Sequence, residues 1–342
     1  MTVNHARRRA ALAALLDGVE AVLVTWPVNV RYLTGLDSSN AAVLVRADGT
    51  AKLATDSRYI ERARGLDIEV VEARDVAKEL AVPGVGIEAA HMTVAVFQRL
   101  DRPVPMEPLV EKVRTVKDDH ELELIRTACA ISDQAFGDIS GNIRPGLTER
   151  DVARILEARM IELGADKPAF ESIVASGENG AVPHHTPGER QLRRGDLVTL
   201  DFGALYQGYH ADMTRTVSLG EPADWQRDLY NLVADAQKAG RHALTPGAVT
   251  GDVDRAARSI IEAAGHGDDF RHGLGHGVGL EIHEDPFLGP SRTGRLEDRV
   301  PITVEPGVYL PGRGGVRIED TLVTRVDGPE LLTKTTKELL VL

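Results

Sequence analysis

The chain has 342 residues, of which 42% are apolar and 27% carry a charge. This length suits about two domains, and the composition is that of a folded protein rather than a disordered one. The 52 acidic side chains outnumber the 40 basic ones, which gives a formal net charge of −12. Because an acidic surface repels phosphate groups, we expect no nucleic-acid partner.

Cysteine content and the length of apolar runs bear on where the protein works. Cys129 is the single cysteine of the sequence, so no internal disulfide can form, which fits a reducing cytoplasm. No apolar run approaches the roughly 18 residues of a membrane span. Three arginines at positions 7–9 precede the short run Ala10–Leu16, but Asp17 ends it, so we expect no signal peptide. We predict a cytoplasmic protein with no membrane partner.

The first third of the chain alternates short apolar segments with helical ones. This alternation predicts an α/β domain over residues 1–115. The predicted strands are Ala21–Val24, Ala42–Arg46, Lys52–Thr55, Ile68–Val71 and Val85–Glu88, and the predicted helices are Ser57–Arg64 and Val76–Leu80. This part of the sequence has no cluster of His, Cys, Asp and Glu with ligand-like spacing, so we expect the chemistry after it.

A second domain is predicted over residues 118–342. It begins where Asp118 and Glu121 form a capping-box pattern before an amphipathic helix that runs to about Ile139. An internal repeat follows, because Pro145–Val152 resembles Pro246–Val253 at a constant offset of 101. The helical patterns after the two copies end in glycines at the same offset, at positions 164 and 265. Two similar halves predict a pseudo-twofold domain with a cleft between them.

Each half also carries a two-strand unit with an acidic residue on each strand. The units are Asp196–Gly203 with Tyr209–Val217, and Pro301–Tyr309 with Gly315–Thr324. A two-residue turn within Tyr206–Gly208 would put Asp201 and Asp212 on one face of the first unit. Glu305 and Glu319 hold the matching places in the second. Four carboxylates in one cleft repel one another, and cations remove that conflict.

A glycine-rich segment at 271–284 contributes imidazoles. It holds His272, His276 and His283, and its glycines let the backbone approach a site closely. Oxygen ligands with one imidazole suit Mn²⁺, Co²⁺, Fe²⁺ or Zn²⁺, as a pair about 3.5–4 Å apart. The predicted metal ligands are Asp201, Asp212, His276, Glu305 and Glu319.

These motifs resemble those of the pita-bread metallopeptidases, which include methionine aminopeptidases, aminopeptidase P and prolidase. The motifs are Asp201, Asp212, Gly-His276-Gly, Val-Glu305-Pro-Gly and Arg317-Ile-Glu319-Asp320. Asn29–Gly35 and Val182-Pro183-His184 resemble the Xaa-Pro peptidase branch with its creatinase-like N-terminal domain. The resemblance implies an α/β creatinase-like domain followed by an α+β pita-bread domain with a pseudo-twofold repeat. It also implies a homodimer.

The resemblance implies roles for the five ligands. Asp201 would bind one metal ion with both oxygens, and Asp212 and Glu319 would bridge two ions. His276 and Glu305 would complete the second ion's shell, and Glu305 would also shuttle the proton. A water activated by two cations, Mn²⁺ being the expected metal, would attack the scissile carbonyl.

Four further side chains receive roles from the same resemblance. His184 and His283 would hold the substrate carbonyl and the oxyanion. His272 would line the pocket for proline, and Arg317 would orient ligands or the end of the substrate. His185 stands where relatives usually have glycine, so it competes with His184 for its role. For binding a product carboxylate, the candidates are Arg317, Arg313 and His272.

The implied function is hydrolysis of the first peptide bond of Xaa-Pro dipeptides or of Xaa-Pro-initiated peptides. The substrate is therefore a short peptide with proline in second position, and the sequence leaves dipeptidase and aminopeptidase activity open. A methionine aminopeptidase-like enzyme is one alternative, although such enzymes usually lack the N-terminal domain. A non-catalytic peptide-binding module on the same fold is another, although such relatives lose metal ligands.

Overall fold

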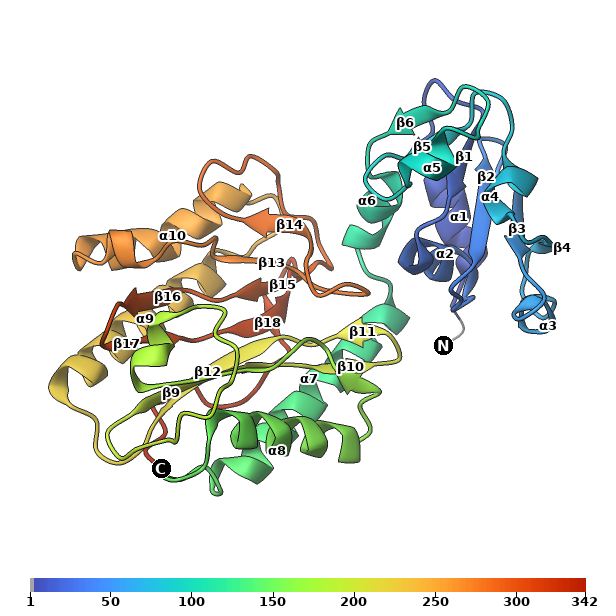
Figure 1. Cartoon of the computed structure of the whole chain (residues 1–342). Helices are drawn as coiled ribbons and strands as arrows, with labels where there is room; N and C mark the ends of the chain where they lie inside the picture. Colours follow the sequence, from blue (N-terminus) through green and yellow to red (C-terminus); the bar gives the residue numbers. More distant parts are fainter. Residues whose placement is uncertain (1–2) are drawn as a thin grey trace. The chain divides into compact units, whose positions relative to one another are not determined.

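The computed structural model describes residues 3–342. The chain divides into two compact units, with the boundary between Thr115 and Val116. Figure 1 follows the chain through both units. Over residues 3–342, no helix combines the length and the apolar character needed to span a membrane.

The first unit contains a six-stranded sheet of order β4-β3-β2-β1-β5-β6. The strands β1, β2 and β3 pair antiparallel, whereas β4, β5 and β6 join parallel to their neighbours. The strands are β1 Ala21–Val24, β2 Ala41–Arg46, β3 Ala51–Thr55, β4 Glu69–Glu72, β5 Gly86–Glu88 and β6 Val104–Met106. The helices are α1 His5–Ala13, α2 Pro27–Thr34, α3 Ile60–Ala63, α4 Val76–Leu80, α5 Val94–Phe97 and α6 Leu109–Thr115.

All five predicted strands of this unit are present within about one residue, and the helix Val76–Leu80 matches. The helix predicted over Ser57–Arg64 is shorter, because Asp56 Oδ1 accepts a hydrogen bond from Arg58 N and holds the segment before α3 in a turn. The arginines before Ala10 lie in α1, which the sequence did not predict. Arg9 is buried there and donates to the carbonyl oxygen of Leu33.

The second unit contains the pseudo-twofold repeat. Its helices are α7 Asp119–Ser140, α8 Glu149–Glu162, α9 Asp224–Ala243 and α10 Thr250–Ala263, with short 3₁₀ turns η1 Gly177–Ala181 and η2 Gly267–Asp269. The strands of the first half are β7 Lys167–Pro168, β8 Ile173–Ser176, β9 Leu197–Phe202, β10 Ala204–Tyr206, β11 Tyr209–His210 and β12 Met213–Ser218. Those of the second are β13 Gly275–Gly277, β14 Glu284–Leu288, β15 Pro301–Val304, β16 Gly307–Leu310, β17 Gly314–Arg317, β18 Asp320–Val323 and β19 Glu330–Leu331.

Each half packs its own pair of helices against its own strands. Helices α7 and α8 contact β7, β8, β10 and β11, whereas α9 and α10 contact β14 to β17 (Figure 1). Two separate apolar cores result. The first includes Phe136 of α7 stacked on Phe202 of β9, and the second includes Ala257 of α10 with Leu274 and Val304.

The repeat extends to single hydrogen bonds. Gly146 N donates to Leu192 O at 2.9 Å, and Gly247 N donates to Leu296 O at 2.7 Å. Both glycines have positive φ, of 95° and 88°. A side chain would strain that backbone, so each copy of the Pro-Gly turn needs its glycine.

The strand register decides where the acidic side chains point. Tyr206 pairs with Tyr209 across a turn of two residues, which confirms the predicted hairpin, and Asp201 pairs with Thr214. Asp212 lies two residues before Thr214, on the face of Asp201.

The predicted strand Tyr209–Val217 is broken, because β11 ends at His210 and β12 begins at Met213, which leaves Asp212 between them. In the second half, both predicted strands are broken. The register runs from Val304 opposite Asp320 to Gly307 opposite Arg317, so Glu305 faces Glu319. Between these pairs the ladder is interrupted. Pro306 has no N–H to donate, so β15 ends before it and β16 begins after it. The interruption leaves both glutamates outside regular strands.

Candidate metal centre

Glycines near two of the acidic residues leave room for close contacts, with backbone in one half and with a tyrosine side chain in the other. A Cβ at Gly203, two residues after Asp201, would lie 1.7 Å from the carbonyl oxygen of Ala211. A Cβ at Gly307, two residues after Glu305, would lie 2.4 Å from Tyr309 Oη. The acid-x-Gly pattern therefore has a steric cause in both halves.

His276 lies at the centre of β13, between β14 and β15. A Cβ at Gly275 would lie 2.0 Å from Thr303 O, so glycine permits this strand to fit beside β15. The His276 ring donates from Nδ1 to Gly277 O at 3.0 Å, in the tautomer that this contact favours. Its Nε2 is then free to act as a ligand atom.

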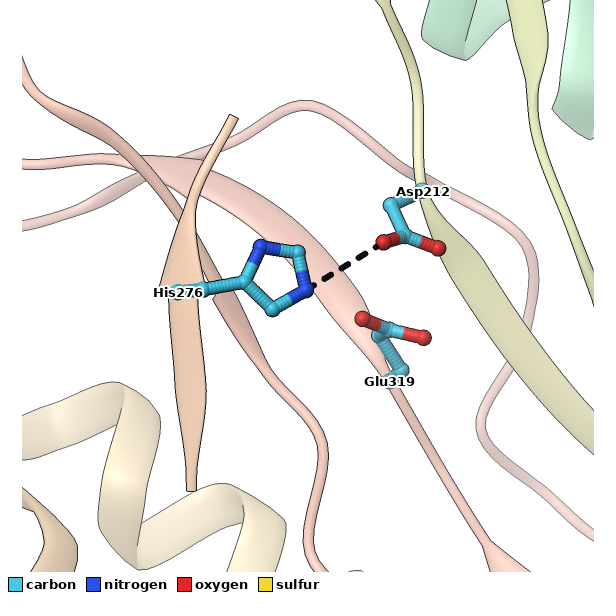
Figure 2. A group of neighbouring side chains, drawn as sticks. All are labelled: Asp212, His276 and Glu319. Atoms are coloured by element: carbon cyan, nitrogen blue, oxygen red, sulfur yellow. Dashed lines mark ion pairs between the residues drawn. The ribbon is translucent and has the colours of Figure 1, made fainter. Parts of the chain in front are cut away.

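Asp212, His276 and Glu319 form a compact group. Each offers one ligand atom, and these atoms all lie within 4.8 Å of one another. Figure 2 shows the three side chains pointing toward a common centre from three separate segments. His276 Nε2 lies 3.5 Å from Asp212 Oδ2 and 3.5 Å from Glu305 Oε1, which adds Glu305 to the group.

These four residues line one cavity together with Asp201. The cavity has a volume of about 310 Å³ and is called the metal cavity below. The structure thus brings together all five residues predicted as ligands. Asp201 Oδ1 and Glu319 Oε1 are buried and have no hydrogen-bond partner among the described residues. Buried acceptors without partners are costly, and a bound cation would satisfy both. The residues present therefore fit a divalent metal ion.

The electrostatics of the site lead to the same conclusion. Burial raises the pKa of Glu305 to about 8. Burial, reinforced by the charge of Glu319, raises the pKa of Asp212 well above its usual value, and burial does the same for Glu319. Burial also lowers the pKa of His276 to about 4, which keeps the imidazole neutral as a ligand must be. These carboxylates cannot all ionise without a cation.

Arg317 holds Asp201 from outside the cavity. Its Nη2 donates to Asp201 Oδ2 at 2.6 Å, its Nη1 to Tyr309 Oη at 2.9 Å, and its Nε to Thr214 Oγ1 at 3.1 Å. Thr214 Oγ1 in turn donates to Glu319 Oε2 at 2.8 Å. The guanidinium thus orients a ligand, and its donors are engaged by protein groups.

The predicted histidines surround the metal cavity. The ring of His283 meets the ring of His276 edge-on, with centroids 4.4 Å apart. His184 lines both the metal cavity and an adjoining cleft of about 760 Å³. His272 lines this adjoining cleft, where its Nε2 lies 2.9 Å from Tyr309 Oη, and burial lowers its pKa to about 4. His185 Nε2 lies 2.8 Å from Glu149 Oε2.

Two known protein families match this chain, one in each domain. The model of metallopeptidase family M24 matches residues 123–325, which is more than half of the chain. This chain belongs to metallopeptidase family M24. The Creatinase/Prolidase N-terminal domain matches residues 7–116 of the M24 chain. The predicted resemblance, the two-domain fold class and the metallopeptidase activity are confirmed.

Similar proteins cover nearly the whole M24 chain. The Xaa-Pro dipeptidase of Pyrococcus furiosus is 36% identical over 334 residues, which are 95% of this chain and 96% of that protein. The structure of an Xaa-Pro dipeptidase from Bacillus anthracis is 36% identical, with a TM-score of 0.96 over 99% of this chain and 100% of that one. An X-Pro aminopeptidase from Thermotoga maritima is 34% identical, with a TM-score of 0.88 over 96% of this chain and 99% of that one.

Sequence reasoning missed three residues that support this M24 site. Tyr309 joins His272 to Arg317, and its position two residues after Gly307 was a signal that a side chain packs there. Thr214 joins Arg317 to Glu319, and Glu149 binds His185. Apart from the contact between Tyr309 and Arg317, which are eight positions apart, these contacts join residues at least 36 positions apart, so no local pattern revealed them.

One predicted candidate lies elsewhere. Arg313, considered as a carboxylate-binding residue, places its guanidinium 4.3 Å from the ring centre of Trp225 and lines neither the metal cavity nor the adjoining cleft. Three arginines line the adjoining cleft: the buried Arg317 and the exposed Arg271 and Arg292. Sequence spacing did not reveal the two exposed arginines.

Proposed function

We propose that this M24 protein is an Xaa-Pro dipeptidase, which hydrolyses the bond before proline in a dipeptide. One observation carries the choice of substrate: the likeness to Xaa-Pro dipeptidases spans the whole chain, including both domains. A bond before proline involves a nitrogen without N–H, so the enzyme must bind the proline ring without a hydrogen bond to that nitrogen. The apolar Val182 and Pro183, beside His272 in the adjoining cleft, suit such a ring.

We propose two divalent cations, with Mn²⁺ expected and Co²⁺, Zn²⁺ or Fe²⁺ as alternatives. Asp201 would bind one ion, Asp212 and Glu319 both, and His276 and Glu305 the other. The two unpartnered buried oxygens, one on Asp201 and one on Glu319, support this set. When bound, the cations would supply Lewis acidity and a water of lowered pKa.

The remaining roles concern the substrate and the proton. Glu305 would move the proton of the attacking water to the leaving nitrogen. His184 and His283 would donate to the carbonyl oxygen as it becomes an oxyanion. His272 would line the proline side, and Arg317 would hold Asp201. The contact of His185 with Glu149 leaves His184 as the better candidate for the oxyanion role.

The choice of dipeptidase rests on charge at the adjoining cleft. The donors of Arg317 are engaged by Asp201, Tyr309 and Thr214, so a product carboxylate needs another cation. The exposed Arg271 and Arg292 line the adjoining cleft and can supply it. The second candidate is an Xaa-Pro aminopeptidase, which the likeness to the Thermotoga maritima protein and the size of the adjoining cleft favour.

A pair of substrates separates the two activities. Met-Pro and Met-Pro-amide differ only in the terminal charge, so a dipeptidase should cleave Met-Pro at least about tenfold faster in kcat/KM. Arg292→Gln should reduce that preference, whereas Arg313→Gln, which alters an arginine outside the adjoining cleft, should keep it. Equal rates on both substrates, with rapid cleavage of longer Xaa-Pro peptides, would favour the aminopeptidase.

We also propose a homodimer in the cytoplasm, with a domain boundary between residues 115 and 118. The dimer rests on the family resemblance. The reducing compartment is supported by Cys129, a buried thiol with no second cysteine to pair with. Light scattering of the purified protein tests the dimer, which a monomeric mass would contradict.

A further inference from the structure

The segment that carries His184 is held by hydrogen bonds to a buried side chain. His184 is exposed and forms no hydrogen bond with any residue that the structure describes. Its direction therefore depends on the backbone to either side of it. That backbone connects η1 to residue 188. Arg317 Nη1 donates to Pro183 O at 3.3 Å, and several other polar groups of the segment meet at one buried side chain, Glu149 at the start of α8.

Glu149 has a fully buried carboxylate that accepts five hydrogen bonds. Oε1 accepts from Ser176 N at 2.8 Å, from Ser176 Oγ at 2.7 Å and from Asn179 Nδ2 at 2.9 Å. Oε2 accepts from His185 Nε2 at 2.8 Å and from Gly188 N at 3.2 Å. The donors lie on both sides of His184 in sequence, so one carboxylate fixes both ends of the segment 176–188.

The internal repeat provides a comparison within the same molecule. Glu149 N donates to Arg190 O and Arg150 N donates to Gly188 O, which joins the start of α8 to the following loop. At an offset of 101, Thr250 N donates to Gly294 O and Gly251 N to Arg292 O. The second half thus keeps the same backbone contacts with a threonine where the first has Glu149.

The backbone contacts at the start of α8 therefore do not require a carboxylate at position 149. A buried charge is costly, and an uncharged residue often replaces one without loss of stability. What distinguishes the first half is the histidine-bearing segment bonded to Glu149. Burial alone would raise the pKa of Glu149, but hydrogen bonds from Asn179, Ser176 and His185 lower it, which keeps the carboxylate ionised as an acceptor.

We propose that Glu149 is a positioning residue, which fixes the segment 176–188 so that His184 faces the metal cavity. Glu149 lines neither the metal cavity nor the adjoining cleft, so it acts on the reaction only through that segment. The inference rests on the proposed role of His184 at the oxyanion. A small displacement of a catalytic group can cost about a hundredfold in rate.

The test is a double-mutant cycle on the metal-loaded enzyme. Glu149→Gln keeps the size of the side chain but turns an NH₂ group toward two or three of the donors. We expect kcat for an Xaa-Pro substrate to fall about tenfold or more, with KM and bound metal little changed. In a His184→Ala background the same substitution should change kcat by less than about threefold, because the residue acted upon is gone.

Three kinetic results would overturn the proposal. One is a normal kcat in folded Glu149→Gln, and another is an equal loss of kcat in both backgrounds, as expected from a merely structural residue. Glu189→Gln is the matched control, because it removes an exposed carboxylate from the same loop and should leave kcat unchanged.

If Glu149→Gln does not fold, His185→Ala and His185→Gln replace it. The glutamine keeps an N–H for Glu149 and should recover most of the kcat lost in the alanine variant. The third overturning result is an equal loss of kcat in His185→Ala and His185→Gln.

The proposed function can fail separately. If His184→Ala has a normal kcat, the oxyanion role of His184 is wrong. The positioning of the segment is then decided by amide hydrogen exchange over residues 180–188. Faster exchange in Glu149→Gln than in the wild type would support the positioning role, and unchanged exchange would overturn it.

Discussion

Arg317 donates to Asp201 across 2.6 Å, from a position where the same guanidinium also reaches Tyr309 and Thr214. The arginine comes from β17 in the second half, and Asp201 comes from β9 in the first. The contact therefore ties the two halves of the pseudo-twofold domain together at the metal cavity. Because the guanidinium is planar and forked, it can hold three partners at fixed angles, which an ammonium group cannot.

Arg317→Lys should therefore impair catalysis although the charge is kept. We expect kcat to fall about tenfold or more, because Asp201 loses its fixed orientation, while the metal content stays near that of the wild type. Steady-state kinetics and metal analysis on one preparation check this. Wild-type kcat in the lysine variant would show that charge alone is sufficient.

Asp212→Asn tests the central carboxylate of the group Asp212, His276 and Glu319. An amide is a poorer metal ligand and removes one negative charge, so the variant should lose at least the more weakly held ion. Turnover should fall about a hundredfold or more, in line with the several kcal/mol that metal ions contribute. The measurement is turnover at matched metal content. Near-normal turnover there would contradict the bridging role.

The histidines can be ranked by their effect on kcat. His184→Ala and His283→Ala should each lower kcat about a hundredfold, with a smaller change in KM, because their donors act on charge that develops in the transition state. His185→Ala should be milder, since His185 bonds Glu149. If His185→Ala has the larger effect, the assignment of these two adjacent histidines is reversed.

The metal-free protein should lose stability as the pH rises. Burial raises the pKa of Glu305 from 4.5 to about 8, so the folded state holds a proton that the unfolded state releases. Below about pH 6.5 the lowered pKa values of His272 and His276 act in the opposite direction, because the unfolded state then binds more protons at these rings. The free energy of unfolding should therefore fall between about pH 6.5 and pH 8, by linkage. In the metal-loaded protein the ligands are ionised and this fall should be absent. The gap between the melting temperatures of the metal-loaded and metal-free proteins should widen by about 2 °C or more over that range. A gap that narrows would contradict the raised pKa.

How far the sequence predicted this molecule depended on the range of the contacts involved. Asp201, Asp212, Glu305 and Glu319 were predictable because strand periodicity, the glycine two residues after Asp201 and after Glu305, and the repeated two-strand unit are patterns of the chain itself. The two-residue turn after Tyr206 followed from the glycine in it. Such signals are local, and the repeat doubled them.

Other features depend on contacts that no local pattern records. Glu149 and His185 are 36 positions apart, and Arg317 and Asp201 are 116 apart. The interruption at Pro306 could have been predicted, since proline lacks an N–H, but the similarity between the two halves suggested unbroken strands. The helix α1 was missed because its arginines were weighed only as the basic start of a signal peptide, whereas Arg9 is buried and donates to the carbonyl oxygen of Leu33.

The most direct test of the account is hydrolysis by one preparation that is stripped of metal and then reloaded. A chelator should abolish cleavage of Met-Pro, Mn²⁺ or Co²⁺ should restore it, and Met-Ala should be cleaved poorly under the same conditions. A metal-loaded sample that cleaves Met-Ala peptides well and Xaa-Pro peptides not at all would contradict the proposed substrate and favour a methionine aminopeptidase-like enzyme. A folded sample that binds no metal ion and cleaves neither would contradict catalysis itself and leave a peptide-binding module.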